Sequence, residues 1–137
     1  MKKKIAIIDG QGGGMGRILI EKLRESLADR IEITALGTNA LATSAMIKAG
    51  ADHGASGENA IVINVAKADI IAGSLGIISA DSFMGELTPA MAAAISASEA
   101  AKVLVPMNRC NLVIAGVKEG SIQSCVEDAV RIIDSLL

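Results

Sequence analysis

The chain has almost no aromatic residues: among 137 residues there is one phenylalanine, Phe83, and no tryptophan or tyrosine. The core is therefore expected to be aliphatic, as in sheets of isoleucine-rich strands packed closely against alanine-rich helices. Aromatic platforms for stacking single-stranded nucleic acid are absent, and the 13 basic and 15 acidic residues are dispersed without a basic stripe. We therefore expect no nucleic-acid partner.

Cysteines and long apolar runs are also scarce. The two cysteines, Cys110 and Cys125, form neither a metal-binding motif nor a disulfide framework. No run reaches the roughly 20 apolar residues of a membrane-spanning helix, and the N-terminal lysines precede too short an apolar segment for a signal peptide. These absences predict a cytoplasmic protein with no metal site and no membrane partner.

The order of strands and helices predicts one domain, 1–137, of the α/β class. Strands are expected in the apolar or alternating runs at 4–8, 31–36, 69–72, 102–106 and 112–117. The last two are too close together for a parallel crossover, so the strand at 112–117 is expected to run antiparallel at an edge. The prediction is a three-layer α/β/α sandwich, Rossmann-like, with a mostly parallel sheet of about five strands. Its strand order is expected to be 2-1-3-4-5, with 3-2-1-4 as the alternative.

A glycine-rich turn joins the first strand to the first helix, and it is the most informative stretch of the sequence. In such turns, backbone N–H groups and the helix dipole face a bound phosphate, and the lack of side chains lets the phosphate approach. A sharp turn alone would need only one or two glycines, whereas five lie between positions 10 and 16. The candidate binding residues of the turn are Gly10, Gln11, Gly12, Gly13, Gly14, Met15 and Gly16.

The turn fits a dinucleotide site only in part. Gln11 stands where the dinucleotide fingerprint has its first glycine. The end of the second strand, 35–39, has no carboxylate for the ribose, although Thr38 or Asn39 could hydrogen-bond a sugar. These differences argue against ordinary NAD. They favour a smaller ligand, either a nucleotide or another phosphorylated metabolite.

Two further loops are expected at the same edge of the sheet, because they follow the third and fourth strands. The first contributes Gly73 and Ser74, and the second contributes Asn108 and Arg109. Arg109 could clamp a phosphate or carboxylate, or it could simply belong to a polar turn.

Two other reactive side chains carry weaker hypotheses. Cys110 could act as a nucleophile, but a small buried hydrophobic residue is the favoured interpretation. The single histidine, His53, lies in an expected loop beside Asp52 and could act as a base, although solvation alone would explain it.

The segment 75–87 fits no single secondary structure. If it folds over the crevice, Glu86 could face a ligand. Alternatively, its apolar residues Ile77, Ile78, Phe83 and Met84 could pack on a second subunit. We favour the second interpretation, and with it a homo-oligomer.

The runs 7–16, 85–91 and 105–110 together resemble a family of short bacterial proteins classed as a domain of unknown function with a Rossmann-like fold. The resemblance extends over nearly the whole chain and implies a stand-alone bacterial domain. It brings no established activity and no catalytic residues.

The leading hypothesis is therefore a domain that binds a small phosphorylated ligand or nucleotide at 10–16. Two alternatives stay open. One is a small enzyme that uses Arg109, Cys110 or His53, and the other is a homo-oligomeric assembly module without catalysis.

Overall fold

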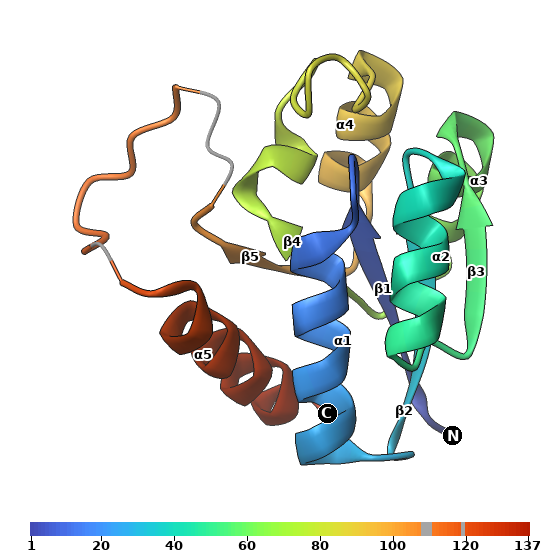
Figure 1. The fold of residues 1–137 in the computed structure, drawn as a ribbon, viewed down its shortest axis with the longest axis vertical. Coiled ribbons are helices and arrows are strands. Elements are labelled where there is room, and N and C mark those ends of the chain that lie inside the picture. Colours follow the sequence, from blue (N-terminus) through green and yellow to red (C-terminus); the bar gives the residue numbers. More distant parts are fainter. Residues whose placement is uncertain (108–110, 119) are drawn as a thin grey trace.

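A parallel sheet of five strands organises the computed structural model of the chain, which describes residues 1–107, 111–118 and 120–137 (Figure 1). The strand order is β3-β2-β1-β4-β5, and every neighbouring pair runs parallel. At the centre, Ile7 of β1 lies beside Ala35 on one side and Ala72 on the other. The strands are β1 (Lys3–Asp9), β2 (Ile31–Gly37), β3 (His53–Ser56), β4 (Ile70–Ser74) and β5 (Ala101–Val105).

Three helices cover one face of the sheet: α1 (Gly14–Leu27), α2 (Ala40–Ala49) and α5 (Ile122–Ser135). On α1, buried leucines recur every four residues at Leu19, Leu23 and Leu27, and charged residues take the other side. This spacing gives the helix one apolar stripe that packs on the sheet. The side chains of Met46 and Val130 extend the same core beneath α2 and α5.

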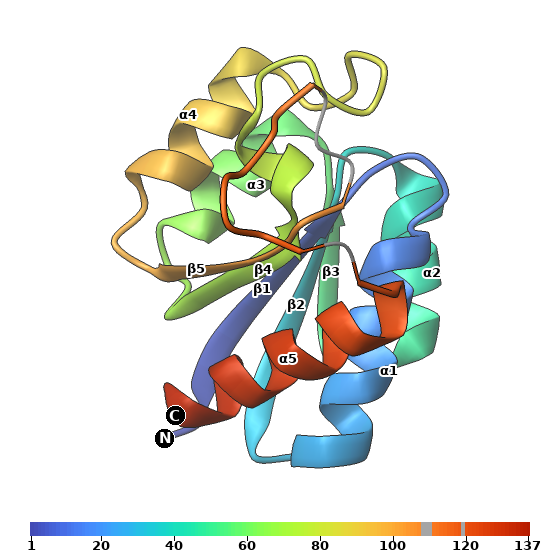
Figure 2. The ribbon, with the colours of Figure 1, turned by 90° about the vertical axis from the view of Figure 1, so that its left-hand side faces the viewer.

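The opposite face carries α3 (Glu58–Val65), a short 3-10 helix η1 (Leu75–Ile78) and α4 (Pro89–Ala97). Figure 2 shows α3 and α4 across the sheet from α1 and α2. The residues Thr88 and Pro89 start α4, because the Thr88 hydroxyl accepts a hydrogen bond from the N–H of Met91 and Pro89 takes the first helical position. The arrangement is a three-layer α/β sandwich with a Rossmann-like topology.

The predicted antiparallel edge strand at 112–117 is wrong. These residues are exposed and contain no strand, and all five strands of the described chain are parallel. The sequence L-V-I-A-G-V has the composition of a strand. That preference is realised only where one face packs on something, and Val113 is 88% exposed.

The fifth strand lies instead at β3, within a segment that was expected to be a loop. Residues 53–56 read H-G-A-S and contain no branched or large apolar residue, so they give no sequence signal for a strand. Their backbone pairs with β2, placing Gly54 beside Ala35. The predicted neighbours of the other four strands are confirmed. With β3 added at the edge, the order is 3-2-1-4-5 in the numbering of the structure, an order found in dinucleotide-binding folds. The predicted alternative, with the strand at 69–72 beside the strand at 31–36, is wrong, because that strand pairs with β1.

All five strands point the same way, so their carboxyl ends meet at one edge of the sheet. Asp9, Gly37 and Ser74 end β1, β2 and β4 there, and α1 and α2 begin beside them. In open α/β sheets this edge is where ligands bind. Within the described ranges, no helix combines the length and apolarity required to cross a bilayer.

Candidate functional site

Asp9, the last residue of β1, holds the glycine turn in place. Its carboxylate is 3% exposed and accepts hydrogen bonds from the N–H groups of Gly10 at 2.8 Å and Gly16 at 2.7 Å. Because Gly13, the residue before α1, has no side chain to cap the helix, Asp9 performs that role from the preceding strand. Burial raises the pKa of Asp9 above its ordinary value, the amide donors partly oppose this rise, and the charge of Glu86 adds to it.

The glycines of the turn divide into two classes, and the first class is required by packing. A Cβ on Gly10 would lie 2.9 Å from Thr38 Oγ1, and one on Gly16 would lie 2.3 Å from Met46 Sδ. Gly13 has φ +76°, and a Cβ there would lie 2.9 Å from the backbone of Ala42. These three glycines are buried, and the fold itself accounts for them.

The second class consists of Gly12 and Gly14, which the fold does not require. Both are exposed, neither has positive φ, and a Cβ at either position would meet nothing within 4 Å. Among the described residues, their N–H groups make no backbone or side-chain hydrogen bond. Gly14 is also the first residue of α1, where the positive end of the helix dipole lies.

Glu86 brings a carboxylate to this edge from the segment that follows β4. One of its oxygens, Oε1, accepts three hydrogen bonds that join the glycine turn to the end of β2. The donors are the N–H of Gln11 at 2.8 Å, Thr38 Oγ1 at 2.6 Å and Asn39 Nδ2 at 2.8 Å. The bond from Thr38 does most to lower the pKa of Glu86, with the Gln11 amide and Asn39 adding to it, and burial only partly opposes them. The carboxylate is therefore held ionised beside the turn.

The segment carrying Glu86 folds inward, which corrects the expectation that its apolar side chains pack on a second subunit. Ile77 is fully buried and Phe83 is 6% exposed, both in the core beneath α3 and α4. The Phe83 ring lies 3.1 Å from where a Cβ on Gly10 would stand. Met84 alone among the large apolar residues of this segment projects outward, at 94% exposure. The structure places the Glu86 carboxylate beside the glycine turn, and the alternative in which Glu86 faces a ligand stays a prediction.

The structure brings some of the predicted site residues to the turn. Asn39 caps α2 with its Oδ1 and donates from Nδ2 to the Gln11 carbonyl at 3.0 Å as well as to Glu86.

The other predicted site residues have different surroundings. Gly73 is accounted for by packing, since a Cβ there would lie 2.6 Å from the Ile8 carbonyl oxygen. The buried hydroxyl of Ser74 has no hydrogen-bond partner among the described residues. Met15 is half-buried in the first turn of α1. Asn108, Arg109 and Cys110 lie outside the described residues.

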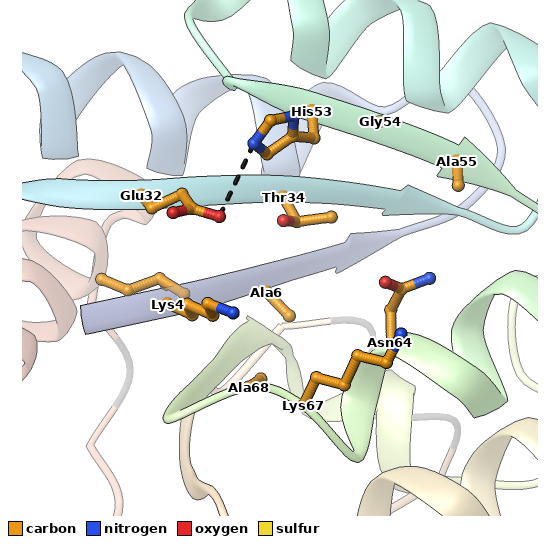
Figure 3. Close-up of a pocket in the computed structure, with 11 residues that line it drawn as sticks. Lys4, Ala6, Glu32, Thr34, His53, Gly54, Ala55, Asn64, Lys67 and Ala68 are labelled. Carbon is orange, nitrogen blue, oxygen red and sulfur yellow. Dashed lines mark ion pairs between the residues drawn. The ribbon is translucent and has the colours of Figure 1, made fainter. Parts of the chain in front are cut away.

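None of the four principal cavities formed by the described residues is lined by the glycine turn. One cavity, of about 280 Å³, lies on the α3 face of the sheet, along the amino-terminal halves of β1 and β2 (Figure 3). We call it the polar trough. Its polar side chains are those of Lys4, Glu32, Thr34, His53, Asn64 and Lys67.

His53 belongs to this trough and is far along the sheet from the turn. Its Nε2 lies 3.6 Å from Glu32 Oε1, and both side chains are partly exposed (Figure 3). Its sequence neighbour Asp52 is engaged elsewhere, with the Arg24 guanidinium at 2.6 Å and the Ile33 N–H at 2.8 Å. The hypothesis that His53 acts as a base therefore stays a prediction, at a position away from the glycine turn. In the described part of the chain, no three histidine, cysteine or acidic side chains are grouped to hold a metal ion.

Sequence reasoning missed two contributors to the turn, Asp9 and the position of Glu86. Asp9 carried a usable signal, because a carboxylate directly before a glycine-rich helix start is placed to cap it. Glu86 carried none, because its partner Thr38 is 48 residues away and the segment between strand and helix had no assigned conformation.

Comparison with models of known protein families gave a match that covers nearly the whole chain. The family model described as a domain of unknown function, DUF3842, matches residues 4–137. Searches of curated proteins and of solved structures gave no match. The matched region is nearly the whole chain and includes the turn, Asp9 and Glu86, so this protein belongs to the DUF3842 family of domains of unknown function.

Proposed function

We propose that this protein binds a nucleotide, or another phosphorylated small molecule, at the turn from Gly10 to Gly16. The observation that carries the proposal is the exposed pair Gly12 and Gly14. Neither glycine is needed for backbone conformation or for packing. A glycine that the fold does not need is understandable where a ligand must approach the backbone closely.

The donors at the turn support a phosphate in particular. The N–H groups of Gly12 and Gly14 are free among the described residues, and they lie at the amino end of a 14-residue helix. Such groups bind anions through hydrogen bonds and through the helix dipole. Asp9 is already committed to the inner N–H groups of Gly10 and Gly16, so it does not compete for the outer ones.

The glycine turn lines none of the four principal cavities of the described residues, which is consistent with a shallow site. Phe83 and Glu86 fill the space above the end of β1, and the outer N–H groups lie beyond them at the surface. A phosphate that rests on exposed backbone needs little enclosure, and the rest of the ligand would extend across the edge towards β2 and Glu86.

The decisive variant is Gly14→Asp. An acidic residue at the first position of a helix favours the helix by roughly 0.3–1 kcal/mol, so the fold should be kept. The new carboxylate would occupy the phosphate position, and we expect nucleotide affinity to fall by about 30-fold or more. The matched control is Ala90→Asp, which adds the same charge in the first turn of α4 on the other face of the sheet.

Isothermal titration calorimetry with NAD, NADP, ADP, ATP and a sugar phosphate measures the effect. Binding by the wild type and by Ala90→Asp, but not by Gly14→Asp, would support the proposal. If no ligand of this panel binds, or if Gly14→Asp binds as well as the wild type, the proposal is wrong.

A second candidate function is self-assembly, and the exposed segment 112–117 favours it. This short stretch carries four large apolar side chains that are 38–88% exposed: Leu112, Val113, Ile114 and Val117. Exposed apolar side chains close together in a soluble protein often mark a protein contact. Light scattering at increasing protein concentration would detect a dimer, and Val113→Ser with Ile114→Ser should then restore the monomer. A monomer at all concentrations contradicts this candidate.

A further inference from the structure

No residue at the end of β2 is acidic, but the fold brings a carboxylate from another part of the chain to that position. In nucleotide-binding α/β folds, an acidic residue at the end of the second strand hydrogen-bonds the ribose hydroxyls. Here β2 ends at Gly37 and is followed by Thr38 and Asn39. The Glu86 carboxylate lies on those two side chains, delivered by a loop on the far side of β1. The sequence-based argument against a ribose site, the missing acid, therefore does not apply to the folded chain.

We propose that Glu86 accepts hydrogen bonds from the free hydroxyls of a ribose, so that the site selects nucleotides without a phosphate at the 2′ position. This inference rests on the proposed function, because it names which nucleotides the turn takes.

The two oxygens of Glu86 have different tasks. Oε1 accepts the three bonds from Gln11, Thr38 and Asn39, which fix the position of the carboxylate. Oε2 has no hydrogen-bond partner among the described residues, so it is available to accept from a ligand. An ionised carboxylate that has lone pairs and no proton can bind a hydroxyl donor, and it cannot bind a second anion.

The charges around Glu86 oppose a 2′-phosphate. The three groups that contact Oε1 are all neutral. The charge of Glu86 also raises the pKa of the buried Asp9, so the titratable group on which Glu86 acts here is a second carboxyl group. A 2′-phosphate would bring about two negative charges to this position, where like charges repel and no described cation contacts the carboxylate. Recognition of such a phosphate ordinarily needs an arginine at this place.

The loop that presents Glu86 is held in one conformation by its own hydrogen bonds. Asp81 and Leu87 pair through the bond from Asp81 N–H to the Leu87 carbonyl, at 2.7 Å, and the Ser82 hydroxyl donates to the carbonyl of Gly76 at 2.5 Å. Phe83, the neighbouring buried residue, anchors the loop in the core. A carboxylate on a fixed support makes a more selective site than one on a free side chain, because little ordering is needed when the ligand binds.

The experiment compares ligands that differ only at the 2′ position. NAD and NADP differ by a phosphate there, and ADP and 2′-deoxy-ADP differ by the hydroxyl. Calorimetry of the wild type should show NAD binding at least about tenfold more tightly than NADP, and ADP several-fold more tightly than 2′-deoxy-ADP. Glu86→Gln should reduce the NAD preference to about threefold or less.

The matched control is Glu99→Gln, which removes the same charge from an exposed position before β5. It should leave the NAD preference unchanged. Circular dichroism and thermal melting show whether Glu86→Gln is folded. If it is not, the wild-type comparison of the two ligand pairs still decides the question.

The outcomes separate the two proposals. If NAD and NADP bind the wild type equally, or NADP binds more tightly, the ribose inference is wrong while nucleotide binding at the turn stands. If Glu86→Gln binds both more tightly by the same factor, Glu86 acts as a cover over the turn, which also overturns the inference. If no nucleotide binds but the sugar phosphate does, the ribose inference is wrong and the proposed phosphate site stands. If no ligand of either kind binds, both proposals are wrong.

Discussion

The two ends of β1 carry very different polar regions. At its carboxyl end, the glycine turn, Asp9 and Glu86 form a closely hydrogen-bonded edge, and none of the four principal cavities of the described residues is lined by the turn. At its amino end, the polar trough offers a cavity of about 280 Å³ and six polar side chains, yet its one ion pair is the loose contact between His53 and Glu32 at 3.6 Å. Cavity volume alone would place a binding site in the trough, whereas the free backbone donors and the hydrogen-bonded carboxylate place it at the turn.

The difference has a structural cause. α3 has only eight residues and does not cover the amino-terminal halves of β1 and β2. The trough is this uncovered part of the sheet surface. The turn is held by hydrogen bonds that join the start of α1 to Asp9 and the end of β2 to Glu86. A hollow is therefore weaker evidence of a binding site here than the unneeded glycines Gly12 and Gly14. The following predictions test that contrast, from the largest expected effect to the smallest.

Removing a carboxylate should lower the stability of the protein at the carboxyl end of β1 but not in the polar trough. Asp9→Ala leaves the buried N–H groups of Gly10 and Gly16 without their acceptor, and the relief of a buried charge offsets only part of that cost. We expect the free energy of unfolding to fall by about 2 kcal/mol. Glu32→Ala in the trough should change it by less than about 0.5 kcal/mol. Urea unfolding measures both, and equal effects would remove the contrast.

The Asp9 effect should also depend on pH. Because the pKa of Asp9 is raised in the folded protein, its contribution to stability is fully present below its unfolded pKa. That contribution is lost as the pH rises through the folded pKa. The stability gap between wild type and Asp9→Ala should therefore be larger at acid pH than at neutral pH. A gap that widens towards neutral pH would show that burial does not dominate the pKa of Asp9.

Two adjacent glycines should respond oppositely to alanine. Gly13→Ala forces a side chain into a left-handed conformation and onto the Ala42 backbone, which should cost about 2 kcal/mol of stability. Gly14→Ala meets open space in the first turn of a helix and should be neutral or stabilising by up to about 1 kcal/mol. Thermal denaturation of the two variants distinguishes them. A destabilised Gly14→Ala would mean that the fold requires this glycine after all.

Near the amino-terminal end of the strands, Asp52 should make the stability of the protein depend on acid pH. Burial by itself would raise the pKa of Asp52, but the Ile33 N–H and the Arg24 guanidinium hold it below its ordinary value. Its contribution is therefore present above the unfolded pKa and is lost as the pH falls through the folded one. Because the pair is partly exposed, we expect less than about 1 kcal/mol. Asp52→Asn should lose less stability than the wild type between about pH 5 and pH 2, as followed by acid denaturation.

Trough variants should leave nucleotide binding unchanged. Lys67→Ala and His53→Ala alter side chains that lie at the other end of the sheet and touch no residue of the turn. Calorimetry should give affinities within about twofold of the wild type. A tenfold loss in either variant would place the ligand in the trough and reverse the comparison.

The sequence was sufficient for features that depend on local chemistry. The predicted strand before the glycine turn is confirmed. The cap of α2 at Asn39 and the start of α4 at Thr88 likewise depend only on residues within a few positions. The buried stripe of α1 also follows from local sequence, because its leucines recur every four residues.

Features that depend on distant partners were not predictable in the same way. β3 is a strand because β2 offers its edge, and the sequence H-G-A-S itself gives no sign of this. The run 112–117 has a strand-like composition but no surface to pack on. Glu86 reaches its three donors across two strands, so its role became visible only once the segment 75–87 had a conformation.

The single aromatic ring of the chain, Phe83, lies against Gly10 at the start of the turn. A chain without tryptophan or tyrosine is nearly silent in intrinsic fluorescence, so it offers no background signal. One tryptophan introduced as Phe83→Trp would therefore report from this edge of the sheet alone. Because aromatic residues are nearly absent, the fluorescence of this one tryptophan would follow ligand binding at the glycine turn without a background signal.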